Sequence, residues 1–474
     1  MIKRTFYRFI RSVLLRYGKR MDAKKMLERS RKNAMAIAMI AAQSSTAYRA
    51  LLKEKGIDAN ALSNKTDLET LPVLTKNNTF GQASLNALVR SVATENIADV
   101  LTSSGSGGTT FGFKLTTRKQ QEGSWFDIDL GLQDVFDVDK YPTLVINCLP
   151  MGVVFRSRAV TVANVSVRED MACSILRALG PRFAQTIVCC DPIFIRQLLH
   201  EGARVGVDWE ALNTSLIMGE EVLVESQREY IAGKLGIDLD HDPKRIIGSS
   251  YGAAELGLNL LFETRDTIRL RRAVRINSDA NALLGFDTCT LSAPSLFCFN
   301  PMRCHIEVLN PNAEGFGELC FTLLDKNALI LLPRYATGDW GKILDADRIK
   351  NTCSMIGCRA PWLPMVAVQG RIRDRVQGIP SVEDIKEMLY EIPAFADKLS
   401  GAFIMELRDD ANILMLTLQL AKGVEKIDLE LIVKFQDLLS SSSKTKEIFL
   451  DFHASESNIW SPLLDYERKF SYMR

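Results

Sequence analysis

The sequence predicts an α/β protein: a large N-terminal domain with a doubly wound, mostly parallel sheet, then a small α+β C-terminal domain. Between residues 143 and 250, short apolar runs alternate with amphipathic helical stretches, the pattern of parallel strands joined by helices. Residues 266–345 contain closely spaced short apolar runs, which predict a β-rich subdomain. The charge density rises beyond Gly370, and 474 residues are enough for more than one domain. We therefore expect domains at 1–369 and 370–474.

The alternating region defines the expected sheet. Strands are predicted at 143–150, 184–190, 214–219 and 245–250, and helices at about 118–137, 168–179, 192–203 and 222–235. Sheets of this kind bind ligands beyond the carboxyl ends of their strands. Two polar segments follow strands directly, MGEE at 218–221 and SSYGAAE at 249–255. We expect a ligand site at this edge of the sheet.

The flanking regions are less regular. Helical spacing covers residues 22–55, and Pro72 marks the segment LETLPVLTK (68–76) as an ordered connector. In the tail, helices are expected near 381–391 and 427–439, and strands near 401–408 and 411–420.

The composition is that of a soluble globular protein, with 47% hydrophobic and 24% charged residues. A formal net charge of only +2 argues against a general nucleic-acid binder. The ten cysteines show no disulfide framework and no secretory signal is visible, so we expect a cytoplasmic protein.

The N-terminus departs from this balance, because residues 1–32 carry 12 Lys/Arg against 2 Asp/Glu. Within residues 1–20, one helical face is apolar (Ile2, Phe6, Phe9, Val13 and Tyr17). Arginines interrupt every apolar run, which excludes a secretory signal and a membrane span. Three interpretations stay open: a helix packed on the body, a helix on a membrane surface, and a dock for an acidic partner such as a carrier protein.

The segment Leu101–Thr117, LTSSGSGGTTFGFKLTT, predicts a strand–loop–strand hairpin with a glycine-rich loop. Glycines let backbone N–H groups approach an anion closely, and Ser and Thr hydroxyls add further donors. The loop therefore suits a triphosphate, although a plain glycine-rich turn is the alternative. No Gly-Lys-Ser/Thr follows, so the helix-opening phosphate loop of mononucleotide-binding proteins is excluded.

Two further segments carry residues suited to a nucleotide. In SSYGAAELG (249–257), Tyr251 beside Gly252 can lie flat against a purine, and Glu255 is suited to hold Mg²⁺. In RYATGDWGKI (334–343), Asp339 follows a tight turn and can accept both ribose hydroxyls. The structural alternatives are a glutamate at a helix start and an aspartate that closes a hairpin.

Two cations near the C-terminal region are also candidates. Arg371 in GRIRDRV (370–376) can reach a ribose or phosphate, or belongs to a charged linker at a domain boundary. Lys469 in DYERKFSYMR can carry a mobile positive charge into an active site, or is a solvated terminal lysine.

The order of these motifs along the chain resembles that of the adenylate-forming ligase superfamily, specifically its phenylacetate–CoA ligase branch. The motifs are, in order, the glycine loop, YG-x-x-E, RY-x-TGD, GR-x-x-D and the late lysine. Three other segments resemble that branch: AYRALLKEKGID (47–58), LPVLTK (71–76) and MGEEV (218–222). The resemblance runs from about residue 40 to the end of the chain.

The resemblance implies a role for each motif residue. Tyr251 and Gly252 would flank adenine, Glu255 would bind Mg²⁺, and Asp339 would bind the ribose. Arg371 would lie at the hinge to a mobile C-terminal domain. Lys469 would bridge the substrate carboxylate and the α-phosphate. The loop residues that would cradle the ATP phosphates are Ser103, Ser104, Gly105, Ser106, Gly107, Gly108 and Thr109.

The implied activity is the conversion of a carboxylic acid, aryl or acyl, into its adenylate by ATP with release of pyrophosphate, followed by acyl transfer to CoA. The sequence departs from the family pattern: Thr110 replaces a common proline, Arg373 replaces the first hinge acid, and the hairpin in VQGIPSVED is short. An amine or a carrier-protein thiol therefore stays open as the acceptor. A non-catalytic relative that only binds nucleotide is the hypothesis of another class.

A cluster in the β-rich region (Cys289, Cys298, Cys304, His305 and Cys320) raises the question of a structural zinc, which some relatives in this branch hold. The spacings are not those of a compact zinc motif, so buried free cysteines are favoured.

Overall fold

The computed structural model describes residues 2–103, 110–286, 291–376, 379–408, 413–442, 447–455, 457, 460, 466 and 470–473. The strands are β1 (Ile97–Thr102), β2 (Phe113–Thr117), β3 (Thr143–Asn147), β4 (Thr161–Asn164), β5 (Gln185–Cys190), β6 (Thr214–Met218), β7 (Ile247–Ala253), β8 (Gly257–Phe262), β9 (Ser295–Phe299), β10 (Cys304–Leu309), β11 (Gly317–Leu323), β12 (Tyr335–Ile343), β13 (Met365–Arg371), β14 (Leu399–Arg408), β15 (Ile413–Leu420) and β16 (Glu447–His453).

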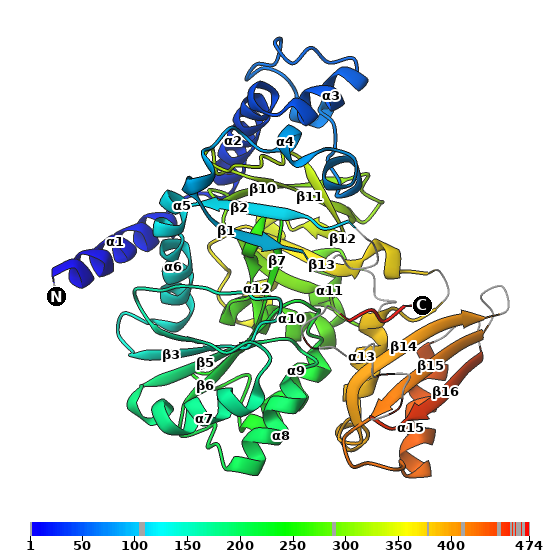
Figure 1. Ribbon diagram of the computed structural model, residues 1–474. Helices are drawn as coiled ribbons and strands as arrows, with labels where there is room; N and C mark the ends of the chain where they lie inside the picture. Colours follow the sequence, from blue (N-terminus) through cyan, green and yellow to red (C-terminus); the bar gives the residue numbers. More distant parts are fainter. Residues whose placement is uncertain are drawn as a thin grey trace.

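The helices lie around these strands (Figure 1). They are α1 (Ile2–Gly18), α2 (Ala23–Ser44), α3 (Thr46–Glu54), α4 (Leu85–Leu88), α5 (Arg118–Gly123), α6 (Trp125–Phe136), α7 (Glu169–Leu179), α8 (Ile195–Val205), α9 (Glu225–Leu235), α10 (Arg265–Ile276), α11 (Ser278–Leu284), α12 (Ala346–Ile356), α13 (Val382–Glu391), α14 (Pro393–Ala396) and α15 (Leu429–Ser442). No helix in the described ranges is long and apolar enough to cross a lipid bilayer.

Most of the large domain is organised by one sheet with the strand order β10-β11-β12-β13-β9-β8-β7-β6-β5-β3-β4. From β7 to β4 every pair is parallel. Strands β3 and β5 are buried along their whole length, as expected where helices cover both faces of a parallel sheet. The α/β fold class is confirmed. β4 was not expected, because its four residues are too few and too polar to stand out in the sequence.

The β-rich region forms the other half of the same sheet. From β7 through β10 every neighbouring pair is antiparallel. The expectation of strands from residue 266 is wrong at its start, because residues 265–284 form α10 and α11. Thr264 and Thr267 build a capping box there, and Ile268, Arg271 and Val274 are buried at helical spacing.

The tail forms a separate sheet with the order β14-β15-β16, and α13 packs against α9 of the large domain. One hydrophobic cluster contains residues of both helices, including Ile231 and Leu389. The Ser226 hydroxyl donates to the Glu387 carbonyl at 2.7 Å, and the Tyr230 hydroxyl donates to Asp397 Oδ1 at 2.6 Å. In this structure the tail is therefore docked on the large domain.

A fully buried group of charges holds β7 in place. The Arg228 guanidinium lies 2.9 Å from Glu225 Oε1 and 2.9 Å from Glu263 Oε1, and it also donates to the Ile247 carbonyl. Glu263 in turn accepts the Ser249 N–H at 2.8 Å. Because Tyr251 and Glu255 follow on the same strand and its turn, this group sets the position of the candidate site.

Replacement of Arg228 by methionine is expected to lower the free energy of unfolding by about 3–5 kcal/mol, because two buried carboxylates lose their main compensating charge. Urea unfolding followed by circular dichroism measures this change. Arg204→Met removes an exposed arginine paired with Glu201 and is the matched control, expected to unfold like the wild type. Equal stability of the two variants would contradict a structural role for Arg228.

Candidate active site

A cavity of about 870 Å³ opens at the expected edge of the sheet. Its walls come from the ends of β5, β6 and β7, from α6, from β8 and from the β1–β2 hairpin. The apolar part of the wall is formed by Ile128, Leu132, Val135, Phe136, Leu149, Ile217, Ile246 and Phe262. A cavity of this size and lining suits a small organic molecule with an apolar body.

Three residues that line this cavity have left-handed backbone conformations without being glycine. The φ angles are 60° at Met151, 70° at Glu220 and 52° at Asn259. Such conformations cost free energy for residues with a side chain, and they concentrate at functional sites. Glu220 belongs to the MGEE segment, which the sequence placed at this edge.

Beside the cavity, two pairs of a tyrosine and a carboxylate lie between strand β12 and β7 with the turn that follows it. The Tyr251 hydroxyl donates to Asp339 Oδ2 at 2.5 Å, and burial together with the nearby Glu255 carboxylate raises the pKa of Tyr335. The two partners on each segment are four residues apart, so each segment supplies one tyrosine and one carboxylate. The structure thus brings together Tyr251, Glu255 and Asp339, three of the residues that the sequence singled out.

At the Glu255 end, a positive charge lies against a buried carboxylate. Lys76 Nζ lies 2.9 Å from Glu255 Oε1 and donates to Ser103 Oγ at 2.9 Å. The Glu255 side chain is only 4% exposed, and within the described residues its Oε1 has no hydrogen bond of good geometry. A buried oxygen of this kind is available to a further positively charged ligand.

Lys76 was not predicted as a site residue. Its segment is held by the start of β12: the Leu74 N–H donates to the Arg334 carbonyl and the Ala336 N–H donates to the Leu74 carbonyl, both at 2.8 Å. The Arg334 guanidinium also donates to the Glu69 carbonyl at 2.8 Å. One sequence signal could have pointed to Lys76: the glycine loop contains no lysine or arginine, so a cation for phosphates must come from elsewhere.

At the other end, Asp339 and Arg371 face each other across the antiparallel pair β12–β13. Arg371 Nε lies 4.0 Å from Asp339 Oδ1. The Tyr251 ring stacks on Phe321 with 5.8 Å between ring centroids. Burial and the neighbouring Asp339 carboxylate raise the pKa of Tyr251, so its hydroxyl keeps its proton and stays a donor.

Gly252 is needed where β7 and β8 approach each other. A Cβ atom at this position would lie 2.8 Å from the Gly257 carbonyl oxygen and 3.0 Å from Leu258 Cα. Gly252 also lines the cavity. The close approach of the two strands explains the glycine, and a role next to a base stays a prediction.

The predicted hairpin is present, since β1 and β2 pair as antiparallel strands. Ser103 closes the mouth of the loop: its N–H donates to the Gly112 carbonyl at 3.0 Å and its hydroxyl accepts the Gly112 N–H at 2.9 Å. Ser103 therefore lies beside Glu255 and Lys76. The other predicted loop residues, Ser104, Gly105, Ser106, Gly107, Gly108 and Thr109, lie outside the described residues.

Lys469 also lies outside the described residues, but the chain that follows it is fixed. The Tyr472 hydroxyl donates to Glu221 Oε2 at 2.6 Å, and Lys386 Nζ lies 2.8 Å from the same oxygen. Glu221 follows Glu220, which lines the cavity. The docked tail thus brings the end of the chain close to the carboxyl end of β6.

Two cations line the cavity where β2 meets β8. Lys114 Nζ donates to the Leu256 carbonyl at 2.9 Å, and the Arg303 guanidinium donates to the carbonyls of Leu258 and Asn259. Burial and the nearby Arg303 charge lower the pKa of Lys114 to about 8. Neither residue was predicted, because each sits in an ordinary strand or turn pattern.

The residues at the Glu255 end fit a magnesium ion that is shared with phosphates. Mg²⁺ prefers oxygen ligands and often takes only one or two carboxylates, with phosphates and water completing the shell. The buried Glu255 Oε1 is an oxygen of this type. No group of three or more His, Cys, Asp or Glu side chains in the described ranges forms a metal site by itself.

The cysteine cluster of the β-rich region is part of the packed sheet. Cys298, Cys304 and Cys320 are buried free cysteines, and burial raises the pKa of Cys304 to about 12. His305 Nδ1 lies 2.8 Å from the Ser30 hydroxyl, within hydrogen-bond distance, and burial lowers the pKa of the imidazole to about 4. Cys289 lies outside the described residues.

Comparison with known proteins identifies the fold. No family model and no curated protein matches the chain. The chain is similar to 2-hydroxyisobutyryl-CoA ligase in the postadenylation state in complex with R3-HIB-AMP, with a TM-score of 0.67 and 12% identity over 96% of this chain and 90% of that chain. The fold is that of the adenylate-forming ligases.

The adenylate-forming fold also matches the same ligase with 2-HIB-AMP and CoA in the thioesterification state, with a TM-score of 0.54 and 13% identity over 96% of this chain and 90% of that chain. At these identities the likeness concerns the fold. The closer relationship to phenylacetate–CoA ligases stays a prediction.

Gly112→Ala tests how tightly Glu255 is packed in this adenylate-forming fold. The added Cβ would overlap Cγ and Oε1 of Glu255, so we expect a loss of stability on the order of 1–3 kcal/mol. Thermal unfolding measures the loss. Gly233→Ala is the control, because its Cβ would meet no atom within 4 Å in α9; a G112A protein as stable as G233A would show that Glu255 is not fixed as described.

Proposed function

We propose that this protein uses ATP to convert a carboxylic acid into its adenylate, releasing pyrophosphate, and then transfers the acyl group to an acceptor, CoA by default. The observation that carries the proposal is a pair of contacts beside the cavity: the Tyr251 hydroxyl donates to Asp339, and Lys76 Nζ lies 2.9 Å from the buried Glu255 carboxylate. These contacts lie in an adenylate-forming fold, next to a cavity of suitable size.

The two ends of this arrangement suit the two ends of ATP. Asp339, with Arg371 4.0 Å away, would accept the ribose hydroxyls. Glu255, Lys76 and Ser103 would receive the phosphates. When bound, magnesium would be held by Glu255 and would neutralise phosphate charge.

Lys76 would supply a positive charge for the phosphates in this arrangement. Carboxylate and triphosphate are both anions, so their approach needs fixed positive charge. Lys76 already lies between Glu255 and the first residue of the glycine loop, where β- and γ-phosphates are expected. It would give up its contact with Glu255 and bind the departing pyrophosphate. Lys469 would supply a second cation, at the α-phosphate.

The acid would occupy the cavity, with its apolar part against α6 and the ends of β5 and β6. Its carboxylate would face Lys114 and the nucleotide. The apolar wall favours an aryl or branched acyl group over a small polar acid.

The acceptor requires a second arrangement of the molecule. The tail is docked on α9 and holds Tyr472 against Glu221. The TM-score is higher for the postadenylation state of 2-hydroxyisobutyryl-CoA ligase than for its thioesterification state. We therefore infer that the docked form performs adenylation and that the tail (residues 370–474) rotates before acyl transfer. An amine or a carrier-protein thiol are the alternative acceptors.

ATP–pyrophosphate exchange over a panel of aryl and acyl acids tests the proposal. We expect exchange with at least one acid, and a loss on the order of 10²–10³ in rate for Lys76→Met. Lys65→Met, in the loop after α3, is the matched control and should exchange normally. The acceptor then follows from the mass of the product when CoA, amines and carrier proteins are supplied.

Nucleotide binding without exchange for any acid would favour the non-catalytic alternative. No nucleotide binding at all would contradict the proposal. Normal exchange by Lys76→Met would remove Lys76 from the mechanism and leave the rest intact.

Lys114 gives the acid affinity an expected pH dependence. Because its pKa is lowered to about 8, Lys114 is charged below this pH and neutral above it. The KM for the acid should therefore rise between pH 8 and pH 9.5, while the KM for ATP stays constant. In Lys114→Arg the charge persists across this range, so the rise should vanish; a rise that survives in this variant would assign it to another group.

A further inference from the structure

Helix α1 exposes its apolar side, unlike an ordinary amphipathic helix. Five of its large apolar residues are between 41% and 67% exposed: Phe6, Phe9, Val13, Leu14 and Tyr17. Their spacing places them on one side of the helix. An amphipathic helix of a globular protein normally buries this side. We call the five residues the α1 apolar face.

The charged side of α1 is the side that packs on the protein. The Arg11 side chain is fully buried, and it pairs with Asp139 and lies 3.6 Å from Asp129 Oδ2. Lys19 Nζ lies 2.7 Å from Asp134 Oδ1. Asp129 and Asp134 belong to α6, and Asp139 follows it. Three acidic partners thus fix the rotation of α1 about its axis and direct the apolar face outward.

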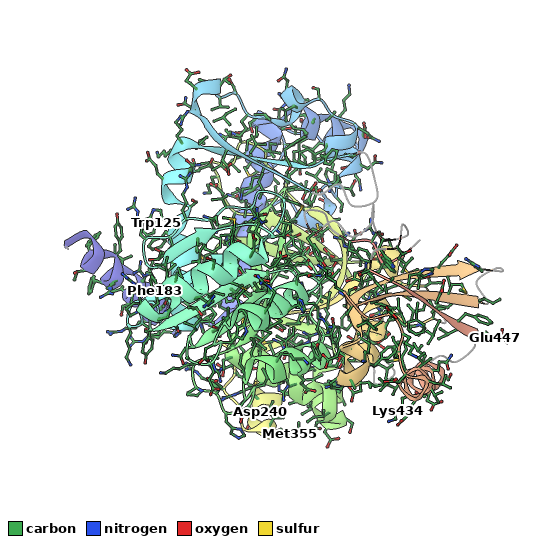
Figure 2. All side chains as sticks on the ribbon, turned by 60° about the horizontal axis from the view of Figure 1, so that its bottom comes forward. Trp125, Phe183, Asp240, Met355, Lys434 and Glu447 are labelled. Carbon is green, nitrogen blue, oxygen red and sulfur yellow. The ribbon has the colours of Figure 1, made fainter. Side chains whose placement is uncertain are left out.

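Aromatic contacts reinforce this orientation. The Tyr7 ring meets Trp125 edge to face at 4.8 Å, and Arg158 covers both rings. Trp125 lies at the base of α1 in Figure 2. Both figures show α1 extending beyond the rest of the molecule.

We propose that the α1 apolar face binds the surface of an anionic lipid bilayer. Residues 1–20 contain seven Lys/Arg and no Asp or Glu. Arg8, Arg11 and Lys19 pair with aspartates of the body, and the other four basic residues complement acidic lipid headgroups. Phenylalanine and tyrosine on an apolar face flanked by basic residues are typical of helices that lie in the bilayer interface. The helix lies on the bilayer rather than across it, since no described helix is long and apolar enough to span one.

A bilayer explains the face better than a second copy of the chain. Two α1 helices in contact would bring together two segments that each carry four basic residues besides those paired with the body, and no acidic residue, and like charges repel. A bilayer offers both a negative surface and an apolar layer. The proposal is independent of the proposed ligase activity, because α1 contributes no residue to the cavity wall.

Co-sedimentation of the full chain with vesicles tests the proposal. The probes are vesicles of phosphatidylcholine with 30% phosphatidylglycerol and vesicles of phosphatidylcholine alone. We expect binding to the anionic vesicles that is at least about tenfold tighter than to the neutral ones and that weakens in 0.5 M NaCl.

The triple variant Phe6→Ser, Phe9→Ser and Tyr17→Ser should bind anionic vesicles at least about tenfold more weakly. The matched control is Ile276→Ser with Leu429→Ser, because these side chains are 82% and 74% exposed elsewhere on the surface; it should bind like the wild type. Circular dichroism confirms that all variants fold.

Three results would overturn the proposal. These are no binding of the wild type to anionic vesicles, equal binding of the triple variant and the wild type, and a dimer in sedimentation velocity that the triple variant abolishes. The last result would assign the α1 apolar face to a second copy of the chain.

Discussion

The candidate site depends on one constraint, two links that hold carboxylates distant in the sequence beside the cavity. The Tyr251 hydroxyl donates to Asp339, and Lys76 pairs with the buried Glu255 at 2.9 Å. The buried charges around Arg228 fix β7 from behind. Both links lie inside the large domain, and movement of the docked tail would leave them intact.

This constraint also determines the electrostatics of the site. Glu255 is buried and would be costly to leave charged without a partner. Lys76 supplies that partner at 2.9 Å, and it comes from a segment that Arg334 holds through the Glu69 carbonyl. A bound nucleotide with magnesium would offer Glu255 a new cation and Lys76 a new anion. Each charged group would thus keep a partner of opposite charge. This exchange explains why Lys76 can point at the position expected for a metal.

The sequence predicted what local patterns determine. Strands β3, β5, β6 and β7 were predicted because their apolar runs are buried, whereas the short and polar β4 was not. Tyr251, Glu255 and Asp339 were singled out because each stands at a turn of distinctive composition. Lys76 was missed because its role depends on contacts with Ser103 and Glu255, far along the chain.

The orientation of α1 shows the same limit. The periodicity of its sequence revealed an apolar side. Of the three interpretations that stayed open, only packing on the body would bury that side, as amphipathic helices normally do. Asp129 and Asp139, which bury Arg11 and turn that side outward, lie too far along the sequence to be connected with the helix from pattern alone. Likewise, the antiparallel strands belong to the same sheet because β13 pairs with β9, a long-range pairing that composition does not encode.

A crystal structure of the protein with ATP and magnesium tests the central claim most directly. The account predicts one nucleotide in the cleft, with its ribose hydroxyls on Asp339, its β- and γ-phosphates within hydrogen-bond distance of Lys76 Nζ, and Glu255 on the metal. A nucleotide bound elsewhere, or one that leaves Lys76 paired with Glu255 and Asp339 without the ribose, would contradict it.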